Sequence, residues 1–186
     1  HKVGAIEWPK STPNPATDFV VTDEQIFDTP TAFRSKVAGK NEAIVFIHGY
    51  NNNFAESLYR FAQISADMEL ESTSVLYAWP TTETSYEYLH DRDSVLFARD
   101  GLQILLEQLA RSGVKRLVLV AHSIGANLLM ETLRQMAISG DQRVRKIIDG
   151  VVLISPDIDP SVFQMQLNGL SPVPSPFVVF STENDN

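Results

Sequence analysis

Short runs of apolar and β-branched residues recur along the chain and limit the folds that it can adopt. Each run has the length of a strand and is nearly continuous in apolar character, which is typical of strands buried on both faces of a parallel sheet. Segments with helical periodicity separate the runs, and strands that alternate with helices predict an α/β fold with a mostly parallel sheet. The runs are AIVFIHG (43–49), SVLYAWP (74–80), RLVLVAH (116–122), GVVLISP (150–156) and PFVVFST (176–182).

Three helices are expected between these strands. Their apolar stripes run from Phe54 to Met68, from Val95 to Leu109 and from Leu129 to Met136, and Gly140 is expected to end the third helix. The first 40 residues have a different pattern. There, VGAIEWP (3–9) and DFVVTDE (18–24) are predicted as two further strands that could form an antiparallel edge.

Length and composition narrow the class of protein. The 186 residues contain no internal repeat, and the Pro-rich GLSPVPSP (169–176) is interpreted as a connection between elements, so residues 1–186 are predicted to form one domain. A formal net charge of −8 without a run of Lys or Arg argues against a nucleic-acid or anionic-membrane surface. No cysteine is present, which excludes disulfides and thiolate metal sites, and no apolar run is long enough for a transmembrane segment.

The stretch RLVLVAHSIGANLL places a serine between an apolar strand and an amphipathic helix. At a nucleophile elbow the serine stands on a sharp turn, and the residues two before and two after it must be small so that strand and helix approach closely. Here these residues are Ala121 and Gly125. Ser123 is therefore the candidate nucleophile. The alternative is that Ser123 only caps the helix, a position that serine prefers.

An acyl-transfer serine also needs two backbone N–H groups directed at the developing oxyanion. One candidate donor is Ile124, directly after the serine. The second is Tyr50 in VFIHGYNNNF, where Gly49 lets the backbone turn at the end of a buried strand and Asn52 or Asn53 caps the next helix. The alternative is an ordinary strand–helix loop with asparagine caps.

Several blocks together resemble one family: HGYN, AWP, YLHDRDS, AHSIG and SPDID, in this order along nearly the whole chain. The chain resembles the bacterial α/β-hydrolases catalogued as domain of unknown function 900. The resemblance implies an α/β-hydrolase-type, doubly wound and mostly parallel sheet with helices on both faces. It implies a catalytic triad in the chain order serine, acid, histidine. An exported or periplasmic location agrees with the resemblance, and a cytoplasmic one is not excluded.

The resemblance places the triad acid after a strand that follows the nucleophile helix. Asp185, just past the strand PFVVFST, is the first candidate. Asp157 and Asp159 in SPDID follow the preceding strand and are the second candidates; alternatively, they cap a short helix that starts near Pro160. Either position would let a carboxylate orient the triad histidine.

None of the four histidines follows the acid. His48 is expected to shape the oxyanion loop, His122 to point to the other side of its strand end, and His90 to lie in the loop after AWP; His1 is terminal. Two explanations stay open. Either the last strand and the histidine loop lie beyond Asn186, or the chain is a degenerate hydrolase without a base.

The segment AWPTTETSYEYLHDRDS carries the remaining marked residues. His48, Trp79, Tyr86 and His90 are the candidates for a substrate pocket, since such pockets are mostly apolar with a few polar groups. The Asp-Arg-Asp run at 91–93 is interpreted as a helix N-cap with an internal ion pair.

These residues predict a serine hydrolase that cleaves a carboxylic ester or thioester through an acyl-enzyme on Ser123, without metal or organic cofactor. Its partner would be a small-molecule ester or a lipid-like substrate. Two alternatives remain. One is a non-catalytic binding or scaffold domain of the same fold, and the other is a metal hydrolase that uses His48, His90 and the SPDID carboxylates.

Overall fold

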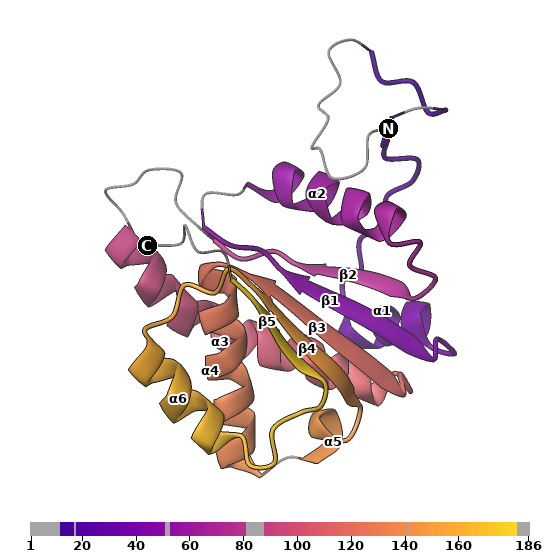
Figure 1. Cartoon of the computed structure of the whole chain (residues 1–186). Coiled ribbons are helices and arrows are strands. Elements are labelled where there is room, and N and C mark those ends of the chain that lie inside the picture. The colour runs from indigo at the N-terminus through magenta and orange to yellow at the C-terminus, as the bar shows by residue number, and fades with distance from the viewer. Residues whose placement is uncertain (1–11, 17, 51–52, 81–87, 141, 182–186) are drawn as a thin grey trace.

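A five-stranded parallel sheet forms the centre of the computed structural model (Figure 1). The structure describes residues 12–16, 18–50, 53–80, 88–140 and 142–181, with only the backbone of 88–93. The strand order is β2-β1-β3-β4-β5. The predicted parallel α/β fold is therefore confirmed, and the five strands predicted between residues 43 and 182 are present. They are β1 (Glu42–Ile47), β2 (Thr73–Tyr77), β3 (Arg116–His122), β4 (Ile148–Ile154) and β5 (Phe177–Phe180).

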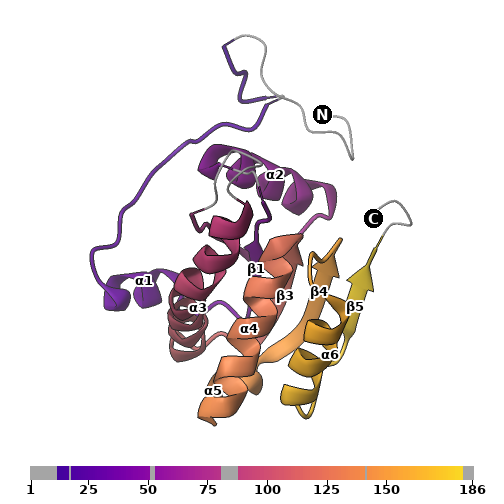
Figure 2. The same ribbon diagram turned by 90° about the vertical axis from the view of Figure 1, so that its left-hand side faces the viewer.

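Helices cover both faces of this sheet (Figure 2). Helices α3, α4 and α6 lie side by side on one face, and α2 lies on the other. The long α4 ends where the sequence predicts, because Gly140 adopts the left-handed conformation with a φ of 75°. The helices are α1 (Pro30–Val37), α2 (Phe54–Asp67), α3 (Tyr88–Arg111), α4 (Ile124–Ser139), α5 (Gln142–Arg145) and α6 (Pro160–Gly169).

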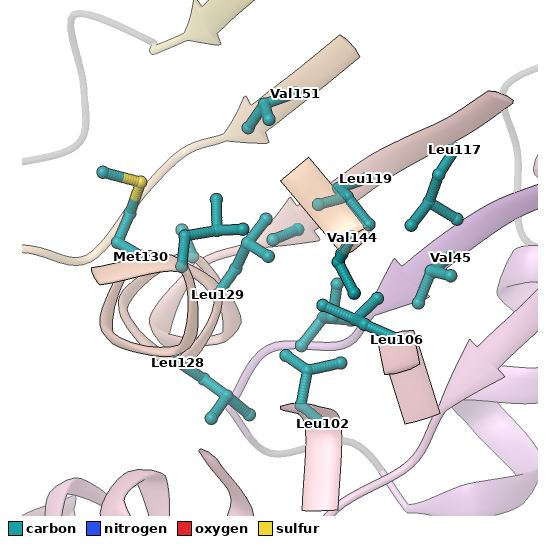
Figure 3. Packing of buried hydrophobic residues seen from close by; sticks show 14 of the residues in the cluster. Val45, Leu102, Leu106, Leu117, Leu119, Leu128, Leu129, Met130, Val144 and Val151 are labelled. Carbon is teal, nitrogen blue, oxygen red and sulfur yellow. The ribbon is translucent and has the colours of Figure 1, made fainter. Parts of the chain in front are cut away.

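The apolar character of the strands is explained by burial on both faces. In β1, Val45 and Ile47 belong to the large cluster that includes α3 and α4, whereas Ile44 and Phe46 face α2 and pack with Phe61. Figure 3 shows the large cluster, in which leucines of α3 and α4 meet the inward residues of the sheet. Since neither face of β1 meets solvent, a strand of this kind shows no polar alternation.

The N-terminal part differs from the sequence prediction. Residues 18–24 form no strand, so this prediction was wrong, and VGAIEWP (3–9) lies outside the described residues. Val21 and Ile26 are 66% and 78% exposed, and no strand among the described residues pairs with this segment. Instead, α1 follows it, and the hydroxyl of its N-cap Thr29 accepts the N–H of Ala32 at 3.2 Å.

Helix α3 begins earlier than predicted. Its first residue is Tyr88, so His90 lies in a helix rather than in a loop. The Asp-Arg-Asp run at 91–93 lies inside this helix. The sequence-based interpretation of this run as the helix N-cap was therefore wrong. Leucine and arginine in this stretch are good helix formers and allow the helix to extend toward its N-terminus.

Candidate active site

The strand order creates a switch point between β1 and β3. The chain passes from β1 to β2 on one side and later returns to place β3 on the other side of β1. In open parallel sheets, the crevice beyond the carboxyl ends of two such strands is where ligands bind. Two segments singled out in the sequence follow these strands: the HGY loop (His48–Tyr50) after β1 and Ser123 after β3.

Ser123 stands in a strained turn. Its φ of 53° and ψ of −131° lie in a region that residues with a side chain rarely adopt. Helix α4 starts at the next residue, yet the Ser123 side chain makes no capping hydrogen bond to that helix. Capping therefore does not explain the serine, and its hydroxyl is not engaged by the helix that follows.

The backbone of Ser123 is hydrogen-bonded to the end of β4 and to the segment after it. Its N–H donates to the carbonyl oxygen of Ile154 at 3.0 Å. Its carbonyl oxygen accepts the N–H of Asp157 at 3.2 Å and that of Ala126 at 2.9 Å. Both the N–H and the carbonyl oxygen of Ser123 are therefore hydrogen-bonded.

Two glycines bring the HGY loop against this turn. A Cβ atom on Gly49 would stand 2.8 Å from Cβ of Ser123 and 2.7 Å from Nδ1 of His122. A Cβ atom on Gly125 would collide with the carbonyl oxygen of His48. Only glycine fits at both positions, so the backbone of the loop lies directly beside the serine side chain.

The first residue of the HGY loop, His48, is buried and packs against Trp79. They are 2% and 5% exposed, and their rings stack with centroids 5.7 Å apart. The backbone N–H of Trp79 donates to Nε2 of His48 at 3.1 Å, so this nitrogen is unprotonated. The other ring nitrogen, Nδ1, carries the proton and donates to the carbonyl oxygen of Gly49 at 2.9 Å.

Burial lowers the pKa of His48 below its usual 6.5 and outweighs the hydrogen bonds to Gly49 and Trp79. With both ring nitrogens engaged, the imidazole is neutral and has no free lone pair for a proton or a metal. His48 therefore shapes the loop, as its position in the sequence suggests. The sequence predicts His48 and Trp79 as pocket residues but gives no sign that their buried rings stack on each other.

The two candidate oxyanion donors are adjacent in sequence to residues of the close contact: Ile124 follows Ser123, and Tyr50 follows Gly49. Ile124 is 1% exposed and is the first residue of α4, so its N–H belongs to the first turn and has no acceptor within the helix. Tyr50 follows Gly49 directly and is half-buried against the large core cluster. Both N–H groups therefore belong to the two segments that meet at Ser123.

The acid candidates are distributed differently. Asp159 is the N-cap of α6, and its carboxylate accepts the N–H groups of Ser161 at 2.8 Å and Val162 at 3.2 Å, which confirms the capping interpretation for this residue. Asp157 is exposed and lies beside Ser123 through its backbone bond. Asp185 and Tyr86 lie outside the described residues, as does the side chain of His90.

Within the described ranges, no three His, Asp or Glu side chains are grouped closely enough to hold a metal ion. In the same part of the chain, none of the helices combines the length and the apolar character needed to cross a bilayer.

The sequence comparison decides the family. Residues 27–186 match the family described as an alpha/beta hydrolase of unknown function, DUF900. The chain belongs to this family. The resemblance seen in the sequence blocks is thereby confirmed, and with it the α/β-hydrolase type of sheet. No curated protein matches the chain.

Solved structures with a similar arrangement include several esterases. The iron-lacking apo form of ESTFA is 17% identical, with a TM-score of 0.47 over 66% of this chain and 39% of that chain. Brefeldin A esterase, a bacterial homologue of human hormone-sensitive lipase, is 18% identical, with a TM-score of 0.47 over 70% of this chain and 37% of its own. A bacterial heroin esterase is 19% identical, with a TM-score of 0.46 over 66% of this chain and 37% of its own. The chain thus spans less than two thirds of the length of these structures, and likeness at this level says nothing about activity.

Proposed function

We propose that this DUF900 domain is a serine hydrolase in which Ser123 is the nucleophile. The supporting observation is the conformation of Ser123, with a φ of 53° between a central strand and a helix and a hydroxyl that does not cap that helix. Strain of this kind persists where the surrounding structure imposes it and is concentrated at functional sites. A nucleophile elbow has this arrangement of strand, strained serine and helix.

In the proposed reaction, the Ser123 hydroxyl attacks the carbonyl carbon of an ester or thioester, and the alcohol or thiol leaves. Water then hydrolyses the acyl-enzyme and releases the acid. The N–H groups of Tyr50 and Ile124 would stabilise the oxyanion, and the N-terminus of α4 adds a favourable partial charge. The close fit of Gly49 against Ser123 supports this assignment, because it brings the loop backbone within reach of the reacting carbonyl.

The proton of Ser123 requires a base, and His48 is not that base, since Nε2 accepts the N–H of Trp79 and Nδ1 donates to Gly49. We propose that a histidine outside the described residues takes the proton and that Asp185 orients it. The alternative is a non-catalytic binding or scaffold domain. It is favoured by one observation: the two histidines with described side chains, His48 and His122, both precede Ser123 in the chain.

The decisive experiment is intact-mass spectrometry of the purified protein before and after treatment with a fluorophosphonate probe. A single adduct on Ser123 is expected, and it should be absent from the Ser123→Ala variant. Ser139→Ala is the matched control, because Ser139 lies in the last turn of the same helix and its hydroxyl donates to Met136. If the wild-type protein gains no adduct and Ser123→Ala leaves ester hydrolysis unchanged, the hydrolase proposal fails.

A further inference from the structure

Ser155 is the second strained serine at the carboxyl edge of the sheet. It follows the last residue of β4 and has a φ of 42°. Among the described residues, the non-glycine residues with positive φ are Glu69, Ser123 and Ser155. Two of the three therefore follow directly after the neighbouring strands β3 and β4, at the candidate site.

The two strained serines are connected through the backbone. The carbonyl oxygen of Ile154, directly before Ser155, accepts the N–H of Ser123 at 3.0 Å. The N–H of Asp157, two residues after Ser155, donates to the carbonyl oxygen of Ser123 at 3.2 Å. Both peptide groups of Ser123 therefore bind the short segment 154–157, which has Ser155 within it.

The conformation of Ser155 allows both bonds. For an acceptor at Ile154 and a donor at Asp157 to reach the same residue, the chain must turn sharply between them. Pro156 disfavours the right-handed helical conformation for Ser155, and the observed turn has a positive φ of 42° at this residue. The turn is also fixed to the next strand, because the N–H of Ser155 donates to the carbonyl oxygen of Phe180 at 2.7 Å.

We propose that Ser155 is a positioning residue that holds Ser123 in its strained conformation. The inference rests on the proposed function, since it assigns a role in orienting the Ser123 hydroxyl. The positive φ of Ser155 places the two backbone partners of Ser123, and these fix the direction of the Ser123 Cα–Cβ bond beside Gly49. A displacement of about 1 Å in such a group is enough to lower a rate by about a hundredfold.

The effect of a Ser155 substitution on kcat should therefore depend on how well the new residue tolerates a positive φ, and not on its polarity. Glycine and asparagine adopt this conformation readily, whereas β-branched residues do not. Ser155→Gly and Ser155→Asn are expected to keep kcat within about threefold of the wild type. Ser155→Thr, which keeps the hydroxyl, and Ser155→Val are expected to lower kcat at least about tenfold with KM within about twofold.

Glu69 provides the matched control. It also has a positive φ, of 50°, but it follows the end of α2, at the opposite end of this helix from the HGY loop. Glu69→Val should lower the melting temperature as Ser155→Val does, because the same conformation is disfavoured. It should leave kcat unchanged when activity is measured below the melting temperature.

The experiment measures the rate constant for fluorophosphonate labelling of Ser123, together with kcat and KM for p-nitrophenyl acetate. If Ser155→Val does not fold, Ser155→Thr decides. Labelling of the Thr variant at the wild-type rate, or a loss of kcat in Glu69→Val as large as in Ser155→Val, would overturn the positioning role while Ser123 remains the nucleophile. If the wild-type protein is not labelled, the proposed function fails first and this inference fails with it.

Discussion

Trp79 donates two hydrogen bonds to His48, one from its indole ring and one from its backbone. The indole N–H of Trp79 donates to the carbonyl oxygen of His48 at 3.0 Å, and the backbone N–H of Trp79 donates to Nε2 of His48 at 3.1 Å. Trp79 follows β2 and His48 follows β1, so the pair joins the ends of two neighbouring strands and fixes the first residue of the HGY loop.

Trp79→Phe should destabilise the protein. The substitution keeps an aromatic ring but leaves the buried carbonyl oxygen of His48 without the indole donor, which costs about 2 kcal/mol. Urea unfolding followed by circular dichroism measures this loss. Phe97→Leu is the control, because Phe97 is 93% exposed and its replacement should change the stability by less than about 0.5 kcal/mol. Equal midpoints for Trp79→Phe and the wild type would contradict the role of the indole bond.

Stability should fall as the pH drops below about 6.5. The pKa of His48 is lowered in the folded protein, so its contribution is fully present above the unfolded pKa of about 6.5. As the pH falls, the unfolded chain takes up a proton that the folded chain resists, and the free energy of unfolding decreases until the folded pKa is reached.

Urea unfolding at pH 8.0 and 5.5 tests this sign for the wild type and for His48→Gln. The decrease between the two pH values should be smaller in the variant, because glutamine does not titrate. An equal decrease in both proteins would assign the pH dependence to other groups.

Gly125→Ala should be among the most damaging small substitutions in the chain. The added methyl group collides with the carbonyl oxygen of His48 and stands 2.9 Å from that of Ile47, so backbone must move. We expect a loss of at least about 2 kcal/mol, even after the better helix propensity of alanine.

Gly150→Ala is the matched control for Gly125→Ala. At Gly150 the added methyl group would meet only Pro176, at the ordinary contact distance of 3.5 Å. Thermal unfolding of both variants provides the comparison, and similar melting temperatures would contradict the close approach of loop and helix.

Asp159→Ala should lower stability without affecting Ser123. The carboxylate caps α6 through two N–H groups, and losing such a cap costs about 1 kcal/mol. Thermal unfolding and fluorophosphonate labelling should therefore respond differently, with a lower melting temperature and an unchanged labelling rate. Labelling that falls in Asp159→Ala but not in Asp157→Ala would instead favour Asp159 as the triad acid.

The sheet could be predicted because its signal is local. Each strand is an apolar run, and β1 illustrates why: Val45 and Phe46 face opposite sides and both are buried. The end of β4 was less predictable. The apolar run continues to Pro156, but the positive φ of Ser155 ends the strand at Ile154, and such a turn depends on partners in other strands.

The candidate site was predictable in its residue types and less so in its contacts. Ser123, Gly49 and Gly125 are visible in the sequence because a close turn restricts them to small residues. The bonds of His48 to Trp79, 31 residues away, are tertiary contacts that no local pattern encodes. The DFVVTDE segment (18–24) shows the opposite case: its residues are strand-like, but in the described part of the chain it pairs with no sheet edge and forms no strand.

The place of β1 between β2 and β3 has a consequence for synthesis on the ribosome. Residues 42–47 emerge well before residues 116–122, with which they pair. At about 5–20 residues per second, one edge of this apolar strand lacks its partner for on the order of ten seconds. During that time the nascent chain exposes the strand edge that will later lie in the middle of the sheet. A chaperone that binds extended apolar segments would find its target there, and aggregation during expression would start there.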